Sequence, residues 1–247
     1  QRSYLNLTGL NTLILSSYEK LKDSKERYQG MQLNTVTGNI KLNKIDFSYN
    51  KSDFLFRNLS ISINPGQLFC ISGSNGDGKT TLSKILMGIL EPSAGEVLVD
   101  GTNLNKLSLK WWKKQVAYIP QNPNILNSSI MDNILLGNDK LNEQEVSRLL
   151  QTVGLDQKLK KTSLTILDPI EDNLSKGVKK KIHYARALAQ NSKIFIIDDP
   201  FGYLDNQGIQ IVQKIIESFK RANKTVILFS DNNILSNVID ENIRIGN

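Results

Sequence analysis

Eight consecutive residues, Gly73 to Thr80, have the types and spacing of a loop that binds phosphate. They read Gly-Ser-Asn-Gly-Asp-Gly-Lys-Thr: a glycine, four residues, then glycine, lysine and a hydroxyl residue. The glycines allow backbone N–H groups to turn inward around phosphate oxygens. In such a loop the lysine reaches the β- and γ-phosphates of a nucleotide, and the hydroxyl binds Mg²⁺. The residues predicted to contact the nucleotide here are Gly73, Ser74, Asn75, Gly76, Asp77, Gly78, Lys79, Thr80 and Thr81.

The segments on either side of this loop are those that it needs. Residues 67–72 (Gln-Leu-Phe-Cys-Ile-Ser) are typical of a strand, and residues 81–87 (Thr-Leu-Ser-Lys-Ile-Leu-Met) are typical of a helix. A helix that begins at the loop directs the positive end of its dipole at the same anion. The alternative is a chance glycine-rich turn, and the flanking strand and helix argue against it.

A carboxylate that could hold the metal of a nucleotide follows a second strand-like run. Residues 194–197 (Ile-Phe-Ile-Ile) are apolar, as in a buried strand, and Asp198 comes directly after them. Open α/β sheets place ligands at the carboxyl ends of their strands, so Asp198 would hold Mg²⁺ there. The alternative is a strand that merely ends in a solvated pair of aspartates.

The composition indicates a soluble globular chain. Of 247 residues, 39% are hydrophobic and 22% charged, and no apolar run approaches the roughly 18 residues that span a bilayer. Cys70 is the only cysteine, which excludes a disulfide framework and indicates a small buried apolar side chain. The net charge of +7 favours anionic partners. We expect the lysine clusters at 158–161 and 179–181 to be solvated helix faces.

The order of strand-like and helix-like segments predicts an α/β fold. Strand-like runs cover residues 40–47, 58–63 and 116–119, and residues 96–101 are typical of a strand and a turn. The middle of the chain, from 129 to about 190, is predicted to be helical, and a helix at 206–221 precedes a buried strand at 225–229. This alternation predicts a parallel sheet with helices on its faces. Residues 1–36 look like a helical lead-in, and because the chain begins with Gln1 we expect it to be part of a longer polypeptide.

Three further segments complete a pattern that resembles the nucleotide-binding domain of ABC transporters. They are Leu-Ser-Lys-Gly-Val at 174–178, Ala-Arg-Ala-Leu at 185–188 and Gly-Tyr-Leu-Asp at 202–205. The resemblance runs from about residue 38 to the end of the chain and involves about six motifs in register. It implies a P-loop NTPase core with a parallel sheet, an N-terminal antiparallel β subdomain, and a helical subdomain at about 122–190.

The resemblance also implies roles for single residues. Tyr49 matches the aromatic residue that stacks on adenine, and Gln121 matches the glutamine that contacts Mg²⁺ and the attacking water. The metal ligands would then be Thr80, Gln121 and Asp198. Ser175 and Gly177 match the signature motif, which closes on the ATP of a second subunit. The implied cofactors are therefore ATP and Mg²⁺.

At the level of the whole protein, the resemblance implies that two such domains hold two ATP molecules between them and drive a transmembrane pore. Residues 37–247 would be the ATP-binding domain of an exporter, at the cytoplasmic face of the membrane. Residues 1–36 would be the helical tail of an upstream transmembrane domain. No nucleic-acid partner is expected. A regulatory half of an asymmetric transporter and a soluble ABC protein acting on nucleic acid are the alternatives.

Several positions depart from the family pattern at its hydrolytic end. Asp199 stands where a glutamate general base is usual, and Asp231 stands where a histidine is usual. An ionised aspartate only accepts hydrogen bonds and repels a γ-phosphate, whereas histidine can donate to it. In the signature, Lys176 replaces a glycine and Val178 a glutamine, and Pro169 replaces a glutamate that contacts the membrane domain. We therefore expect a domain that binds Mg-ATP and hydrolyses it slowly or not at all.

Two features invite other interpretations. His183, the only histidine, follows the signature segment, and we expect it to be a partly solvated helix residue rather than a catalytic one. The neighbouring Trp111 and Trp112 could stack on nucleic-acid bases, but a helix face that packs on the core or toward the transmembrane domain is the favoured interpretation.

Overall fold

The computed structural model describes residues 29–50, 53–136, 141–156 and 174–246. The predictions for the helical lead-in up to residue 28, for the lysine cluster at 158–161 and for Pro169 therefore lie outside the described residues.

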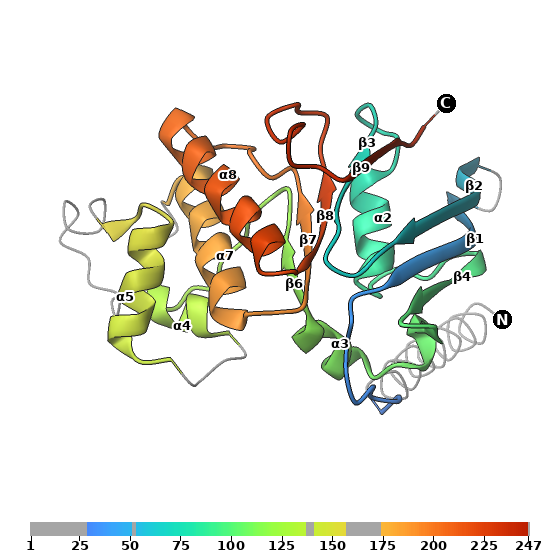
Figure 1. Ribbon diagram of the computed structural model, residues 1–247, viewed down its shortest axis with the longest axis horizontal. Coiled ribbons are helices and arrows are strands. Elements are labelled where there is room, and N and C mark those ends of the chain that lie inside the picture. Colours follow the sequence, from blue (N-terminus) through green and yellow to red (C-terminus); the bar gives the residue numbers. More distant parts are fainter. Residues whose placement is uncertain (1–28, 51–52, 137–140, 157–173, 247) are drawn as a thin grey trace, which may run out of the picture.

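A parallel sheet of five strands forms the centre of the molecule (Figure 1). Its strands are β3 (Leu68–Ser72), β6 (Val116–Ile119), β7 (Ile194–Asp198), β8 (Thr225–Phe229) and β9 (Glu241–Arg244). They lie in the order β6-β7-β8-β3-β9, and every neighbouring pair is parallel. Every residue of β7 and β8 is buried, which explains why both segments are continuous apolar runs in the sequence. The prediction of a parallel α/β sheet is confirmed.

A second, antiparallel sheet lies beside the first (Figure 1). Its strands are β1 (Ile40–Asn50), β2 (Asp53–Ile63), β4 (Ala94–Val99) and β5 (Thr102–Asn103), in the order β2-β1-β4-β5. Ile40 pairs with Ile63 on one side and with Val99 on the other. This sheet is the antiparallel β subdomain that the family resemblance implies.

The helices lie on both sides of the parallel sheet (Figure 1). They are α2 (Lys79–Leu86), α3 (Leu109–Gln115), α4 (Ile130–Leu135), α5 (Glu143–Thr152), α7 (Lys176–Gln190) and α8 (Asn206–Arg221), with a 3-10 turn at Leu104–Lys106. Figure 1 shows α7 and α8 on one side of the sheet, α2 on the other, and α4 and α5 beyond α7. None of the described helices combines the length and the apolar composition needed to cross a membrane.

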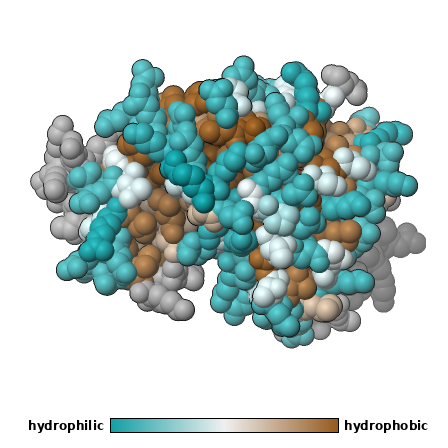
Figure 2. Space-filling view, viewed as in Figure 1, coloured by the Kyte–Doolittle hydropathy of each residue, from teal (hydrophilic) through white to brown (hydrophobic). Residues whose placement is uncertain are grey.

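The central sheet separates two hydrophobic cores. Phe195 and Ile197 of β7 belong to the core under α7 and α8, whereas Ile194 and Ile196 belong to the core shared with α2 and the antiparallel sheet. This division follows from the alternation of side chains along a strand. The face of the molecule shown in Figure 2 is covered mostly by hydrophilic side chains, with apolar ones showing between them. Because a hydrophobic core packs against each face of the sheet, its strands are held in place and so are the ends of the loops at its carboxyl edge.

Helix α7 differs from the sequence prediction. The solvated face predicted for the lysine run 179–181 is wrong, because Lys180 and Lys181 are buried, and so is the partly solvated position predicted for His183. The physical reason is that α7 packs against β6 on one side and against α4 and α5 on the other. The lysine stems fill this space while their amino groups reach backbone carbonyls.

Other packing predictions are confirmed. Trp112 is fully buried, and its ring N–H donates to the carbonyl of Leu86, so it packs on the core. Cys70 is buried in β3, and burial raises the pKa of its thiol to about 11, so it is an unreactive apolar side chain.

Candidate nucleotide site

The glycine-rich loop 73–80 joins β3 to α2 and takes a conformation that only glycine adopts readily. Gly76 and Gly78 have φ values of 100° and 94°, in the left-handed region. A Cβ atom at Gly78 would lie 2.5 Å from the ring of Phe56, whereas one at Gly76 would meet nothing within 4 Å. Gly78 also serves as the N-cap of α2. The loop therefore enters the helix through a close turn that a larger residue would obstruct.

The first turn of α2 is left open to an external ligand. No side chain caps α2, whereas a side-chain oxygen caps each other described α-helix: Ser108, Ser129, Asn142, Ser175 and Asp205. Uncapped N–H groups and the positive end of the helix dipole favour an anion at this position. Lys79, the first residue of α2, adds a positive charge.

A cleft of about 550 Å³ opens at the carboxyl edge of the parallel sheet, in front of this helix end. It brings together most of the residues that the sequence singled out. The lining residues are Ser74, Asn75, Gly76, Gly78, Lys79, Thr80, Thr81, Gln121, Asp198, Asp199, Phe229, Ser230, Asp231 and Asn232. The phosphate-type loop thus faces the ends of β6, β7 and β8 across one cavity.

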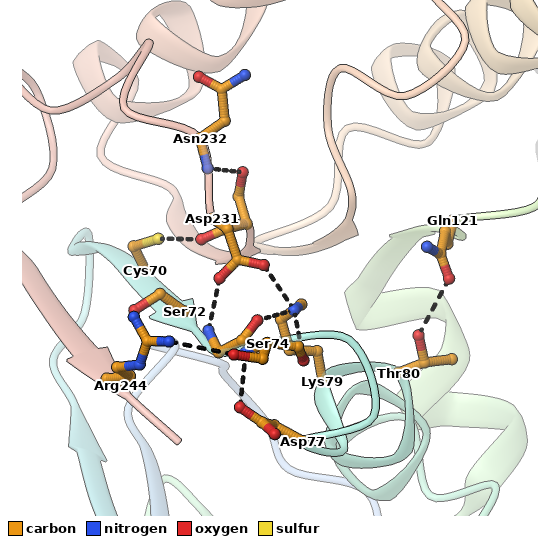
Figure 3. Close-up of polar contacts among 12 residues, drawn as sticks. Cys70, Ser72, Ser74, Asp77, Lys79, Thr80, Gln121, Asp231, Asn232 and Arg244 are labelled. Atoms are coloured by element: carbon orange, nitrogen blue, oxygen red, sulfur yellow. Dashed lines mark hydrogen bonds and ion pairs between the residues drawn. The ribbon is translucent and has the colours of Figure 1, made fainter. Parts of the chain in front are cut away.

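Asp231 makes direct contacts with the glycine-rich loop (Figure 3). Its Oδ1 accepts the N–H of Gly73 at 2.7 Å, and its Oδ2 pairs with Lys79 Nζ at 2.7 Å. Lys79 Nζ also donates to the carbonyls of Gly73 and Ser74. Partial burial alone would raise the pKa of Asp231, but the hydrogen bonds from Lys79 and Gly73 outweigh it and hold this pKa below its usual value. The carboxylate is therefore ionised when it contacts the loop.

Three oxygen-bearing side chains in the cleft fit a hard cation. Thr80 Oγ1 lies 3.5 Å from Gln121 Oε1 (Figure 3), and Oδ2 of Asp198 is buried without a hydrogen-bond partner. Burial raises the pKa of Asp198, which the Thr80 hydroxyl, Lys180 and Lys79 partly oppose. A hydroxyl, an amide oxygen and a carboxylate suit Mg²⁺, which binds through one or two carboxylates together with phosphate oxygens. No three His, Cys, Asp or Glu side chains of the described residues form a metal cluster.

Sequence reasoning missed Lys180, which lies directly behind this set. Its amino group is fully buried and donates to the carbonyl of Pro120 at 2.8 Å and to that of Asp198 at 3.0 Å. These two carbonyls belong to residues that end or directly follow β7 and β6, so Lys180 fixes the two strand ends relative to each other. Burial lowers the pKa of Lys180 to about 8, against the attraction of Asp199 and Asp198. No local signal marks it, because a lysine run reads as a charged surface.

Two predicted residues lie at the margins of the cleft. Tyr49 is 64% exposed and is not among the lining residues, but its hydroxyl lies 2.9 Å from Thr81 Oγ1, so its ring stands beside the start of α2. Asp199 lines the cleft, and its backbone has a φ of 50° and donates to the carbonyl of Phe229 at 3.0 Å. The aspartate therefore holds a sparsely populated left-handed conformation at the end of β7.

The segment 174–178 lies apart from the cleft. Ser175 caps α7 by accepting the N–H of Val178 at 3.3 Å, and neither Ser175 nor Gly177 lines the cavity. A Cβ atom at Gly177 would lie 2.6 Å from the carbonyl oxygen of Tyr203. Lys176 Nζ stands 4.6 Å from the ring centroid of Tyr203. In this structure, the glycine and the lysine of this segment contact the chain's own 202–205 turn.

The hydroxyl of Tyr203 extends these contacts to the residue after Gln121. It accepts from Lys176 Nζ at 3.4 Å and donates to Asn122 Oδ1 at 2.8 Å. Sequence reasoning gave neither Tyr203 nor Asn122 a role. Three segments far apart in the sequence are thereby joined at the surface.

Comparisons with known proteins point to one family. The sequence profile of the family described as ABC transporter matches residues 56–202. Similar relatives include ABC transporter B family member 26, chloroplastic, of Arabidopsis thaliana, which is 33% identical over 77% of this chain and 28% of its own length. The beta-(1-->2)glucan export ATP-binding/permease protein NdvA of Rhizobium etli is 28% identical over 85% of this chain and 36% of its own length.

Another relative, ABC transporter B family member 13 of Arabidopsis thaliana, is 29% identical over 84% of this chain and 17% of its own length. The chain therefore spans between about a sixth and a third of the length of the curated relatives that it matches. Among solved structures, a bacterial Atm1-family ABC exporter with ATP bound has a TM-score of 0.79 at 21% identity, over 88% of this chain and 38% of that one. This last likeness concerns the fold.

Proposed function

The chain belongs to the ABC transporter family, and from this premise we propose that residues 37–247 are its ATP-binding domain, with the cleft as the nucleotide site. The observation that carries the proposal is the loop 73–80, which opens an uncapped helix beside the buried carboxylate of Asp198. Backbone N–H groups, the helix dipole and Lys79 together provide the positive field that a triphosphate needs. The loop residues 73–81 bind the phosphates, and Tyr49 receives the adenine ring against its exposed face.

The oxygen ligands Thr80, Gln121 and Asp198 are proposed to hold Mg²⁺. When bound, the ion supplies positive charge that neutralises the phosphate oxygens. Lys180 positions two of these ligands, because it holds the carbonyl of Asp198 and that of Pro120, the residue before Gln121. The metal ligands Gln121 and Asp198 are thus positioned through hydrogen bonds from Lys180 to the backbone.

Hydrolysis is proposed to be slow. Gln121 orients the attacking water and Asp199 is the candidate base, but its side chain is one methylene shorter than that of a glutamate. A base misplaced by about 1 Å can lower the rate on the order of a hundredfold. Asp231 bears negative charge in the cleft, where a donor to the γ-phosphate would assist. The two substituted residues Asp199 and Asp231 both line the cleft.

The proposed partners are a second nucleotide-binding domain and a transmembrane domain. Ser175 and Gly177 would face the ATP bound by the partner domain across a dimer interface. Residues 1–36 would be the linker from the transmembrane domain, and the helical subdomain would run over about 122–190. The name of the Rhizobium relative, an export ATP-binding/permease protein, supports an exporter at the cytoplasmic face of a membrane.

A second candidate is the regulatory half of an asymmetric ABC transporter, which binds ATP and leaves hydrolysis to its partner. The acidic side chains Asp199 and Asp231 favour this candidate, because both line the cleft at positions where a longer base and a donor to the γ-phosphate would assist hydrolysis. The two candidates differ in turnover and in the partner, not in the site that binds ATP.

Turnover of the 247-residue chain tests whether hydrolysis is slow. We expect fewer than about one ATP hydrolysed per second by the 247-residue chain in Mg²⁺, and several per second from sites built only of this chain would contradict slow hydrolysis. The double variant Asp199→Glu with Asp231→His restores the usual base and donor, and we expect it to raise turnover by about tenfold or more. An unchanged rate would show that these two positions do not limit hydrolysis.

A further inference from the structure

The two carboxylate oxygens of Asp231 both contact donors of the glycine-rich loop. One accepts the Gly73 N–H and the other pairs with Lys79 Nζ, each at 2.7 Å (Figure 3). A backbone N–H and the loop lysine are the kinds of donor that a phosphate group takes in such a loop. The Asp231 carboxylate thus already binds two of the donors that a nucleotide phosphate would use.

The segment after β8 holds Asp231 in this position. The N–H of Asn232 donates to Ser230 Oγ at 3.1 Å, and the N–H of Ile234 donates to Asn232 Oδ1 at 2.8 Å. The carboxylate itself is 49% exposed, while Lys79 is 15% exposed. The backbone of this turn is therefore anchored, and the carboxylate alone can turn toward solvent by rotating its side chain.

We propose that Asp231 sets the nucleotide preference of the cleft, because its carboxylate competes with the terminal phosphate of a nucleoside triphosphate for Lys79 and leaves a diphosphate undisturbed. This inference rests on the proposed function, since it presumes that the loop binds nucleotide. A triphosphate must displace Asp231 from Lys79 or place its γ-phosphate beside a second negative charge, and either costs affinity. A diphosphate needs the lysine for its β-phosphate only. Asp231 can then keep its contact with Lys79 at the place that the γ-phosphate of a triphosphate would take.

The surrounding charges fit this arrangement. Arg244 Nη2 donates to Ser74 Oγ at 3.2 Å and lowers the pKa of Asp231 by its charge, so the loop carries a second cation near this anion. Asp77 faces the other way, with its Oδ2 accepting the N–H of Ser74 at 2.6 Å. Among the described residues around the loop, Asp231 is the carboxylate that both lines the cleft and contacts Lys79.

The same chemistry recurs away from the cleft at Asp240, which provides a matched control. Asp240 pairs with Lys220 Nζ at 2.5 Å and accepts the N–H of Leu68 at 2.8 Å, so it too takes one lysine and one backbone donor. It does not line the cleft. If the two carboxylate–lysine pairs are only structural, substitutions of Asp231 and of Asp240 should have similar effects. If Asp231 sets the nucleotide preference, only its substitution should change the relative affinity for ATP and ADP.

The test is the affinity of the 247-residue chain for ATP and for ADP, each with MgCl₂, in wild type and in the variants Asp231→Asn, Asp231→Ala and Asp240→Asn. We expect both Asp231 variants to bind ATP about tenfold more tightly, the lower end of what a hydrogen bond to a charged group contributes, with ADP changed by less than about threefold. Asp240→Asn should leave both affinities unchanged.

Equal changes for ATP and ADP would overturn the inference, because Asp231 would then act only through the net charge of the cleft. Weaker ATP binding in both Asp231 variants would overturn it too, since the carboxylate would then support the nucleotide. If wild type binds neither nucleotide, the proposed function itself fails. Thermal unfolding of each variant identifies any that does not fold, and the pair of Asp231 substitutions keeps the test decisive if one is lost.

Discussion

Two loops of this molecule lead into helices at glycine-containing turns, and they differ in whether a side chain caps the helix. The loop 73–80 enters α2 without a side-chain cap and opens onto the cleft. The segment 174–178 enters α7 with Ser175 as its cap, and Lys176 and Gly177 contact Tyr203. The first helix start has no side-chain cap and faces the cleft, where Asp231 contacts Gly73 and Lys79. The second helix start is capped by Ser175 within the chain.

The difference indicates an order of events for the proposed function. Nucleotide can enter the first loop of an isolated domain, because that loop needs only backbone groups and Lys79. The second loop can contact the nucleotide of a partner domain in two ways. Either Lys176 first leaves the ring of Tyr203, or Lys176 and Tyr203 approach the nucleotide together. Substitutions at Gly78 and Ser175 probe the two helix starts, and a substitution at His183 probes the interior of α7.

The largest expected effect concerns the turn into α2. Gly78→Ala should lower the free energy of unfolding by about 3–4 kcal/mol, because it combines left-handed strain with crowding against Phe56. Gly76→Ala is the matched control, with a similar φ but open space, and should cost about 1–2 kcal/mol. Urea unfolding of both variants measures the two values. Equal losses would show that crowding at Gly78 contributes nothing.

A somewhat smaller effect, dependent on pH, is expected in α7. Burial lowers the pKa of His183 from 6.5 to about 4, and its Nε2 lies 2.8 Å from the carbonyl oxygen of Asn124. His183 therefore takes up a proton near pH 6.5 in the unfolded chain but only near pH 4 in the folded chain. The stability that neutral His183 provides is complete above pH 6.5 and is lost as the pH falls to 4, by up to about 3 kcal/mol.

The variant His183→Gln isolates this contribution. His183 is the only histidine of the chain, so the difference between wild type and variant removes the carboxylates that titrate in the same window. We expect the difference in unfolding free energy to change between pH 6.5 and 4 and to be constant above pH 7. A constant difference over the whole range would mean that His183 takes up its proton in the fold as readily as in the unfolded chain.

The smallest expected effect concerns the cap of α7. Ser175→Ala should lower the free energy of unfolding by about 1 kcal/mol, while Ser175→Gly should cost only a few tenths. The reason is that Ser175 accepts the N–H of Val178, and glycine leaves that group accessible to water. Denaturant titration of the two variants provides the measurement. A cost near zero for alanine would mean that the start of α7 is as open as that of α2.

The sequence was most informative where function depends on local order. Residues 73–80 lie consecutively, and the strand at 194–197 is a continuous apolar run, so both could be recognised without the fold. The helix from 206 to 221 and the strand from 225 to 229 were also predicted with the bounds that the structure has. Each of these features is set by neighbouring residues.

The missed features depend on residues that are distant in the chain. Asp231 pairs with Lys79 across 152 residues, and Lys180 reaches the carbonyl of Pro120 across 60. No periodicity marks such contacts. The lysines of α7 were predicted to be solvated because a charged run usually is, and only the packing of α7 between β6 and the α4–α5 pair reveals that Lys180 and Lys181 are enclosed.

The central claim is that the loop 73–80 binds the phosphates of ATP, and one titration tests it most directly. ATP affinity should be measured in the presence of Mg²⁺ for wild type, for Lys79→Ala, and for Lys84→Ala, a lysine of the same helix that does not line the cleft. The account predicts a loss of about a hundredfold for Lys79→Ala, as expected for a lost charged hydrogen bond to phosphate, and little change for Lys84→Ala. Equal affinities of wild type and Lys79→Ala, or a wild type that binds no ATP, would contradict it.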